Sequence, residues 1–352
     1  MDLVKVLACA LCLTGTTVEA EVETAELVPL GQVEFSGTLA GARDLSAAQR
    51  LGDWLVVASD ENAVVQFLER SEGHDYRFHH ALPLHAKPDV ELDIEALALD
   101  GEQLYALGSH SRYRRRVRPD AEPDENSRRF SEVRYREHRD SLFRIAIDPD
   151  SGQPRGDMEH RSLRAVLESQ PVLAPFLAAP GKENGVDFEG LAVVDGLMLI
   201  GFRGPVLRHN YLPVLALRFD DIDACADPQP PAATACELRF LNLRGRGVRG
   251  MHTVTGGVLL IAGPVGDGRF DYHLYFWDGR DCFPSREAAG CRLVDLGIIP
   301  GTHDAGAEGI AVLSENATGW EVLVVYDGVV GGKPARFRVP RPEPGIRRPA
   351  AR

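Results

Sequence analysis

Acidic side chains recur at one position of a repeated pattern, in which two short strands are joined by a tight turn. Asp93 and Glu95 directly precede one apolar run, Asp187 and Glu189 precede another, and Glu308 holds the place of the glutamate in a third copy. Because successive side chains of a strand point to opposite faces, each aspartate shares a face with its glutamate. Carboxylate oxygens suit Ca²⁺ or Mg²⁺, so the pattern predicts a metal site at these five residues, with calcium as the possible cofactor.

A second interpretation of the same glutamates is structural. Each could cap neighbouring backbone amides, or pair with an arginine as a clip between adjacent repeats. Four arginines lie in the same or adjacent strands, and they could instead clamp a phosphate or carboxylate: Arg203, Arg208, Arg246 and Arg249. The residue types leave both interpretations open.

Three histidines stand near the repeats. His110 and His252 follow repeat strands closely, and His303 precedes the third glutamate. Each could act as a general base or a metal ligand, so His110 and His252 are candidate catalytic residues. The alternative for each is a loop histidine that forms hydrogen bonds.

The spacing of the copies predicts the fold. Ser46, Glu95, Glu189, Arg249 and Glu308 take the same register, with Arg249 60 positions after Glu189 and Glu308 59 positions after Arg249. Four-stranded repeats of roughly 40 to 50 residues are typical of propeller blades, and loop insertions would lengthen them. We therefore expect an all-β chain folded as a single β-propeller, with five repeat units visible and six or seven blades possible. The first strand of each blade would line the axis, so the repeated acids would converge on one mouth.

Known catalytic motifs are missing from the sequence. Residues 245–250 match the dinucleotide pattern G-x-G-x-x-G, but a strand follows where that motif needs a helix. There is no nucleophile elbow, no H-E-x-x-H and no P-loop. The formal net charge of −13 over 352 residues argues against a nucleic-acid binder.

The N-terminus and the cysteines predict export. Residues 1–20 resemble a secretory signal peptide, whose apolar run is too short to span a bilayer. Four cysteines follow it as two close pairs, for which the simplest connectivity is Cys225–Cys236 and Cys282–Cys291. We expect a periplasmic or secreted protein without a transmembrane segment.

The remaining segments complete the domain plan. Residues 21–30 are expected to be a loose leader, 31–340 the propeller and 341–352 a disordered tail. Residues 33–37 could pair with 335–339 and close the last blade. An arginine-rich insertion, 111–140, has no apolar period, which favours a solvated loop over the alternative of an anion-binding lid. Residues 162–177 have helical spacing broken by prolines, which predicts short surface helices.

Several of these segments also carry a family resemblance. Residues 182–192, 200–208, 245–249, 262–264 and 307–309, together with 93–96 and 108–111, resemble an exported bacterial family catalogued as domain of unknown function 3616. More distantly, the chain is similar to the esterase-like propeller domain named after phytase. The resemblance implies a β-propeller and export, and it implies no reaction.

Two functions from different classes fit these observations. We expect a scaffold, monomeric in solution, that binds a small anionic ligand or a periplasmic protein at a mouth lined by acids and arginines. The alternative is a metal-assisted, phosphoesterase-like hydrolase in which a bound Ca²⁺ or Mg²⁺ polarises a phosphoryl group.

Overall fold

The structure is a computed structural model that describes residues 26–87, 90–227, 235–268, 270–284, 290–301 and 305–342. The expected signal peptide, half of the expected leader, nearly all of the expected tail and His303 lie outside these ranges. None of the helices in the described part is long and apolar enough to cross a membrane.

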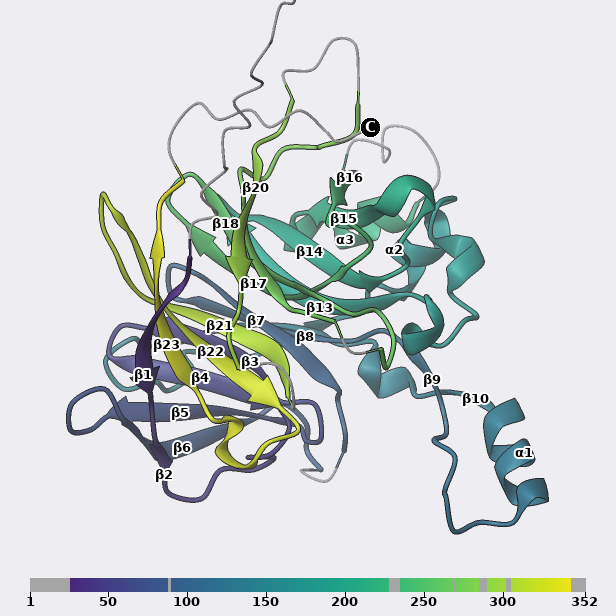
Figure 1. The fold of residues 1–352 in the computed structure, drawn as a ribbon, viewed down its shortest axis with the longest axis horizontal. Coiled ribbons are helices and arrows are strands. Elements are labelled where there is room, and N and C mark those ends of the chain that lie inside the picture. Colours follow the sequence, from purple (N-terminus) through teal and green to yellow (C-terminus); the bar gives the residue numbers. More distant parts are fainter. Residues whose placement is uncertain are drawn as a thin grey trace, which may run out of the picture.

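Five sheets, each built on four antiparallel strands, follow one another around a shared axis (Figure 1). The first blade contains β3 (Leu45–Leu51), β4 (Trp54–Ser59), β5 (Val64–Arg70) and β6 (Tyr76–Pro83). The second contains β7 (Ile94–Asp100), β8 (Gln103–Gly108), β11 (Leu142–Ala146) and β12 (Glu159–Arg161). The third contains β13 (Asp187–Val194), β14 (Leu197–Gly204), β15 (Tyr211–Leu217) and β16 (Cys236–Asn242). The fourth contains β17 (Gly247–Val254), β18 (Gly257–Gly263), β19 (His273–Trp277) and β20 (Leu293–Ile298). The fifth contains β21 (Gly306–Glu315), β22 (Gly319–Asp327), β23 (Ala335–Pro340) and the N-terminal β1 (Val28–Gln32).

The innermost strands close the ring. Each of β3, β7, β13, β17 and β21 contacts the innermost strand of the blade on either side. Side chains reinforce these contacts: Ser46 and Gln49 donate to carbonyls of the second blade, and Thr253 exchanges hydrogen bonds with Val193. The prediction of a single β-propeller is thus confirmed, with five blades rather than six or seven.

The last blade is closed by an N-terminal strand, although by a different segment from the predicted one. Val28 pairs with Arg338 and Gln32 with Ala335, so the sheet begins inside the expected leader. The predicted residues 33–37 instead form β2 (Phe35–Ser36), which runs parallel to β6 in the first blade. The apolar anchors explain the difference, because Leu27 is buried in the core of the fourth and fifth blades and Val33 in that of the fifth and first.

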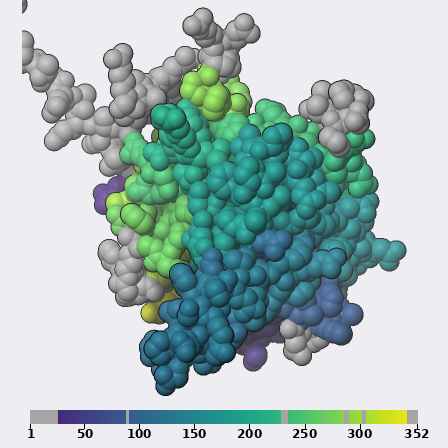
Figure 2. Space-filling model, turned by 90° about the vertical axis from the view of Figure 1, so that its right-hand side faces the viewer, coloured from purple at the N-terminus to yellow at the C-terminus, as the bar shows by residue number. Residues whose placement is uncertain are grey.

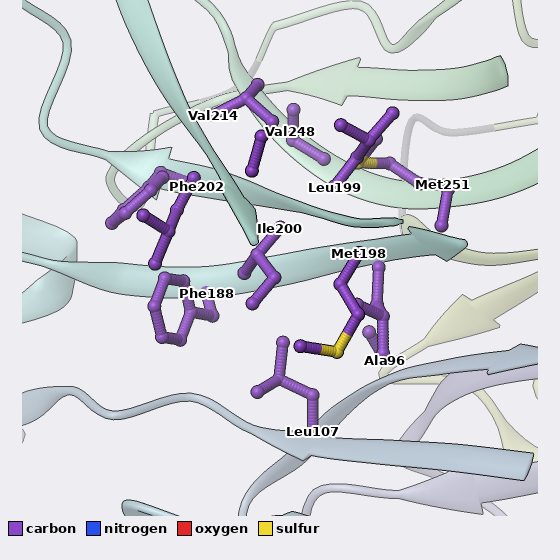
Figure 3. Packing of buried hydrophobic residues seen from close by; sticks show 14 of the residues in the cluster. Ala96, Leu107, Phe188, Met198, Leu199, Ile200, Phe202, Val214, Val248 and Met251 are labelled. Atoms are coloured by element: carbon purple, nitrogen blue, oxygen red, sulfur yellow. The ribbon is translucent and has the colours of Figure 1, made fainter. Parts of the chain in front are cut away.

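The core lies between neighbouring blades. Figure 3 shows Ala96 and Leu107 of the second blade against Met198 and Ile200 of the third. Val248 of the fourth blade belongs to the same buried cluster. This interdigitation holds each inner strand at a fixed distance from the next, which positions whatever side chains those strands carry at the axis.

The arginine-rich insertion is more ordered than its sequence suggested. It folds as β9 (Arg112–Arg114) paired with β10 (Val133–Tyr135), with α1 (Pro123–Ser131) between them and η1 (Glu137–Arg139) after them. It stands out from the propeller (Figures 1 and 2). Cation–π contacts take the place of an apolar core in this insertion: the guanidinium of Arg112 lies over the ring of Tyr135, and that of Arg139 over the ring of Tyr113.

Short helices lie on the surface of the blades. The predicted ones in 162–177 are α2 (Arg164–Ser169) and η2 (Ala174–Phe176). The others are η3 (Gly181–Glu183), η4 (Arg208–Asn210), η5 (Phe219–Asp221), α3 (Ile222–Ala226) and η7 (Val330–Gly332).

Candidate functional site

Every inner strand has a β-bulge at the same point. The register against the second strand of the blade shifts near the start of β3, β7, β13, β17 and β21, and in β13 it shifts in two steps. The residues at these shifts are those that the sequence aligned: Ser46, Glu95, Glu189, Arg249 and Glu308. A bulge leaves its residue unpaired and re-aims its side chain. The five bulges bring these residues together at one end of the axis, which we call the acidic mouth.

One half of the acidic mouth is neutralised by arginines. Arg203, at the end of β14, contacts Asp187 through Nη2 and lies with Nη1 2.7 Å from Oε1 of Glu189. Arg249 lies with Nη1 3.1 Å from the same Glu189 oxygen and contacts Glu308 through Nη2. All five residues are buried, and Asp187 and Glu189 are each only 1% exposed. Of the five predicted metal ligands, these three carboxylates therefore form the arginine clip that was the alternative interpretation.

The other half of the acidic mouth is a carboxylate cluster. Asp60, Asp93 and Glu95 each bring one oxygen to within 4.8 Å of the others. Asp93 is anchored by Arg139, whose Nη1 lies 2.8 Å from its Oδ2, and it accepts a hydrogen bond from Ser109. The side chain of Glu95 has no hydrogen bond or ion pair within the described residues, and Oδ1 of Asp60 is buried there without a partner.

The electrostatics of this cluster disfavour three negative charges. Burial raises the pKa of Asp60 to about 8, and the neighbouring charges of Asp93 and Asp327 add to the effect. Burial and the carboxylate of Glu189 raise the pKa of Glu95 well above its usual value. Burial also raises the pKa of Asp93, although Arg139 opposes the shift. Without a cation, these carboxylates would have to take up protons.

The cluster fits a hard divalent cation. Ca²⁺ binds oxygens at about 2.3 to 2.6 Å, so the ligand oxygens of one ion lie within about 5 Å of each other. A further ligand oxygen is near. Oε2 of Glu189 is buried without a partner in the described part of the chain, and the charge of Glu189 raises the pKa of Glu95. Asp60, Asp93 and Glu95 would hold the ion, with Glu189 beside them.

Asp60 was not among the predicted site residues. The repeats align on their first strands, whereas Asp60 follows the second strand of the first blade. A signal did exist, because Asp327 ends the second strand of the fifth blade in the same way and also acts on the pKa of Asp60.

The other predicted binding arginines lie elsewhere. Arg208 is exposed in η4, and Arg246 precedes β17 and donates from Nε to the carbonyl of Asp271 at 3.2 Å. Neither forms an ion pair with the acids of the mouth within the described ranges. Of the four predicted arginines, Arg203 and Arg249 are the two that contact acids of the mouth.

The candidate histidines do not join the carboxylate cluster. His110 is buried, its Nδ1 donates to the carbonyl of Gly108 at 2.9 Å, and its Nε2 accepts from the amide of Leu163 at 3.1 Å. Both ring nitrogens are thus used, and burial lowers its pKa to about 4. His252 lies in β17 beyond the bulge, with a buried Nδ1 that lacks a partner in the described residues and a pKa that burial lowers to about 4.

The two predicted cysteine pairs differ in their redox state. Cys282 and Cys291 form a disulfide. Cys225, in α3, and Cys236, at the start of β16, are thiols, with Sγ of Cys236 4.0 Å from the carbonyl oxygen of Cys225. The loop between them, 228–234, lies outside the described residues.

Comparison with known proteins gives a family and distant structural likenesses. The sequence profile of the family described as "Protein of unknown function (DUF3616)" matches residues 44–339. None of the curated proteins matches the chain.

Solved structures match over most of the chain at low identity. Glutaminyl cyclase of Myxococcus xanthus is 12% identical, with a TM-score of 0.41, over 88% of this chain and 97% of that one. The PQQ-bound aldose sugar dehydrogenase of Streptomyces coelicolor is 11% identical, also with a TM-score of 0.41, over 90% and 98%. A family 117 glycoside hydrolase of Zobellia galactanivorans is 10% identical, again with a TM-score of 0.41, over 90% and 91%.

Proposed function

We propose that this chain, which belongs to the family of unknown function whose profile it matches, binds Ca²⁺ or Mg²⁺ at the acidic mouth and, with that cation, a small anionic ligand. The observation that carries the proposal is the carboxylate cluster of Asp60, Asp93 and Glu95, whose oxygens lie within 4.8 Å of one another. We further propose that the protein acts in the periplasm or outside the cell, which the Cys282–Cys291 disulfide supports.

A cation explains the cluster better than structural pairing does. Arg139 reaches Asp93, but within the described residues no guanidinium contacts Asp60 or Glu95. The clip on the opposite half shows what this fold does with carboxylates that need only neutralisation, because there Arg203 and Arg249 contact all three acids. Acids that gather without such partners are those for which a metal ion supplies the missing charge.

The arginine clip supports an anionic ligand next to the ion. Ca²⁺ takes six to eight oxygens, more than three carboxylates supply, so positions stay open to a ligand oxygen. The Nε atoms of Arg203 and Arg249 are buried without partners in the described part of the chain. Guanidinium donors beside a cation suit a carboxylate or a phosphate monoester.

Binding is favoured over hydrolysis as the basic activity. Both ring nitrogens of His110 are occupied, and His252 is not part of the carboxylate cluster. Metal-assisted hydrolysis of a phosphate ester is the second candidate, favoured by the arginines beside the carboxylates. When bound, the cation would polarise a phosphoryl oxygen or supply a hydroxide.

Thermal unfolding with and without CaCl₂ or MgCl₂ tests the proposal. A ligand of the native state stabilises it by about 2.7 kcal/mol at a hundred times its Kd, so the cation should raise Tm by several degrees. Asp60→Asn and Glu95→Gln should abolish the rise, whereas Glu72→Gln, in an exposed turn of the first blade, should retain it. A wild-type Tm that neither ion moves would overturn the proposal. Release of phosphate from an aryl phosphate, dependent on the ion and lost in Glu95→Gln, would assign hydrolysis.

A further inference from the structure

Two adjacent histidines of the first blade turn the same ring atom toward each other. Nδ1 of His79 lies 2.9 Å from Nδ1 of His80. Neighbours in a regular strand point to opposite faces, but β6 has a bulge here, because Phe67 pairs with His80 and Leu68 with Phe78. His79 is the unpaired residue of that bulge. The bulge explains how two consecutive imidazoles come to lie on one side of the strand.

The ring of His80 is fixed by its surroundings. It stacks on Phe67 at 4.7 Å between ring centroids with 4° between the planes, and Trp54 lies edge-on at 5.7 Å. Its Nε2 lies 3.0 Å from the carbonyl oxygen of Gly152, an acceptor, so this nitrogen carries the proton. The neutral ring therefore has its lone pair on Nδ1, the atom that faces His79. An N–H donated to a backbone carbonyl is the support that histidine ligands of metals usually have.

We propose that His79 and His80 chelate a transition-metal ion, Cu²⁺ or Ni²⁺, through their two Nδ1 atoms. Metal–imidazole bonds are about 2.0 to 2.1 Å long, so two nitrogens at 90° around one ion lie about 2.9 Å apart, and at a tetrahedral angle about 3.4 Å apart. The separation in the structure matches the 90° geometry that Cu²⁺ and Ni²⁺ adopt, rather than that of Zn²⁺. Without metal, Nδ1–H of His79 donates to Nδ1 of His80.

The site is open to solvent on one side and lies near the Glu69–Arg77 ion pair on another. His79 is exposed, so its Nε2 can carry its proton into water while Nδ1 binds the ion, and waters fill the remaining positions. The carboxylate of Glu69 lies near enough to act electrostatically on His79. Arg77 pairs with that carboxylate and offsets its charge, so Glu69 is not expected to supply a ligand atom. This site shares no residue with the acidic mouth and does not depend on the function proposed for it.

Titration of the whole protein with CuCl₂ in the presence of excess CaCl₂ tests the inference, since calcium prefers oxygen ligands. Trp54 reports binding, because its ring lies 5.1 Å from that of His79 and Cu²⁺ should quench its fluorescence. Electron paramagnetic resonance should show two equivalent nitrogens on the copper.

The variants separate this pair from other surface histidines. His79→Ala, at an exposed position, should weaken copper binding at least tenfold and leave one nitrogen in the spectrum. His80→Gln should do the same and keeps more of the packing on Phe67. The control is His74→Ala, an exposed histidine in the preceding turn, which should bind copper as the wild type does. Equal affinity in His79→Ala and His74→Ala, or a spectrum with only oxygen ligands, would overturn the inference.

Discussion

Arg249 of the fourth blade lies with Nη1 3.1 Å from Oε1 of Glu189 in the third. The two residues occupy the same bulge position of neighbouring inner strands. The repeat therefore supplies opposite charges at equivalent places, and the fold brings them together between adjacent inner strands. Because the same guanidinium also contacts Glu308 of the fifth blade, one side chain links three consecutive blades. This linkage divides the acidic mouth into a half neutralised by Arg203 and Arg249 and a half in which, among the described residues, Asp93 alone has an arginine partner.

Removal of this linking arginine should destabilise the propeller. Arg249→Met would leave Glu189 and Glu308 buried without that partner, and breaking a buried ion pair from one side costs about 3 to 5 kcal/mol. Urea unfolding would measure the loss in the free energy of unfolding. Arg246→Met, the matched control outside the clip, should change the free energy of unfolding by less than about 1 kcal/mol. Equal losses in the two variants would show that the clip does not stabilise the ring.

The pH dependence of stability should depend on the divalent cation. The carboxyl group of Asp60 has a usual pKa of 3.8, and burial raises it to about 8 in the folded protein. Between about pH 4 and 8, the folded state thus holds more protons than the unfolded chain. Its stability therefore falls as pH rises through that window.

A bound cation should replace those protons and remove the decline. In EDTA, Tm should drop between pH 5 and 8, and the drop should be smaller in Asp60→Asn, which cannot ionise there. With millimolar CaCl₂, Tm should hold or rise over the same range. Parallel curves with and without calcium would contradict this expectation.

Cys225 and Cys236 of the third blade should be able to form a disulfide. Sγ of Cys236 lies 4.0 Å from the Cys225 carbonyl, and burial raises the pKa of the Cys225 thiol. A mild oxidant should form the bond more readily as the pH is raised, because the raised pKa keeps the Cys225 thiol protonated near neutrality. The bond would stabilise by about 2 to 3 kcal/mol in the chain-entropy view. Peptide mapping by mass spectrometry and Tm would follow it. Cys236→Ser should show no gain, and free Cys225 and Cys236 after prolonged oxidation would contradict the expectation.

The sequence could predict what the repeats encode locally, and not what depends on pairing between distant segments. The register of Glu95, Glu189, Arg249 and Glu308 follows from short patterns that are each visible alone, so their convergence was predictable once the propeller was inferred. Asp60 was not, because it stands on a second strand and the first strand of its blade carries Ser46 instead of an acid.

The closing strand and the insertion show the same limit. Residues 28–32 and 33–37 are both plausible partners of β23, and burial of Leu27 and Val33 in different inter-blade cores decides between them. The insertion is held by arginine–aromatic contacts, which have no periodic signature in the sequence. In both cases the deciding energy comes from neighbours far away along the chain.

The small residues that follow the bulges should be intolerant of added volume. After the bulged residue comes Ala or Gly in every blade, at 47, 96, 190, 250 and 309. A Cβ on Gly250 would stand 2.2 Å from the carbonyl oxygen of Glu308, a backbone atom of the next inner strand that has no rotamer to move. Gly250→Ala must therefore push the fourth and fifth blades apart, at a cost of about 1 to 3 kcal/mol or more.

The control is Gly290→Ala, where a Cβ meets nothing within 4 Å. Because the shift would also displace Glu308 from Arg249, Gly250→Ala should unfold at lower urea than Gly290→Ala. The same unfolding midpoint in both variants would mean that the inner strands do not approach as closely as the bulge geometry requires.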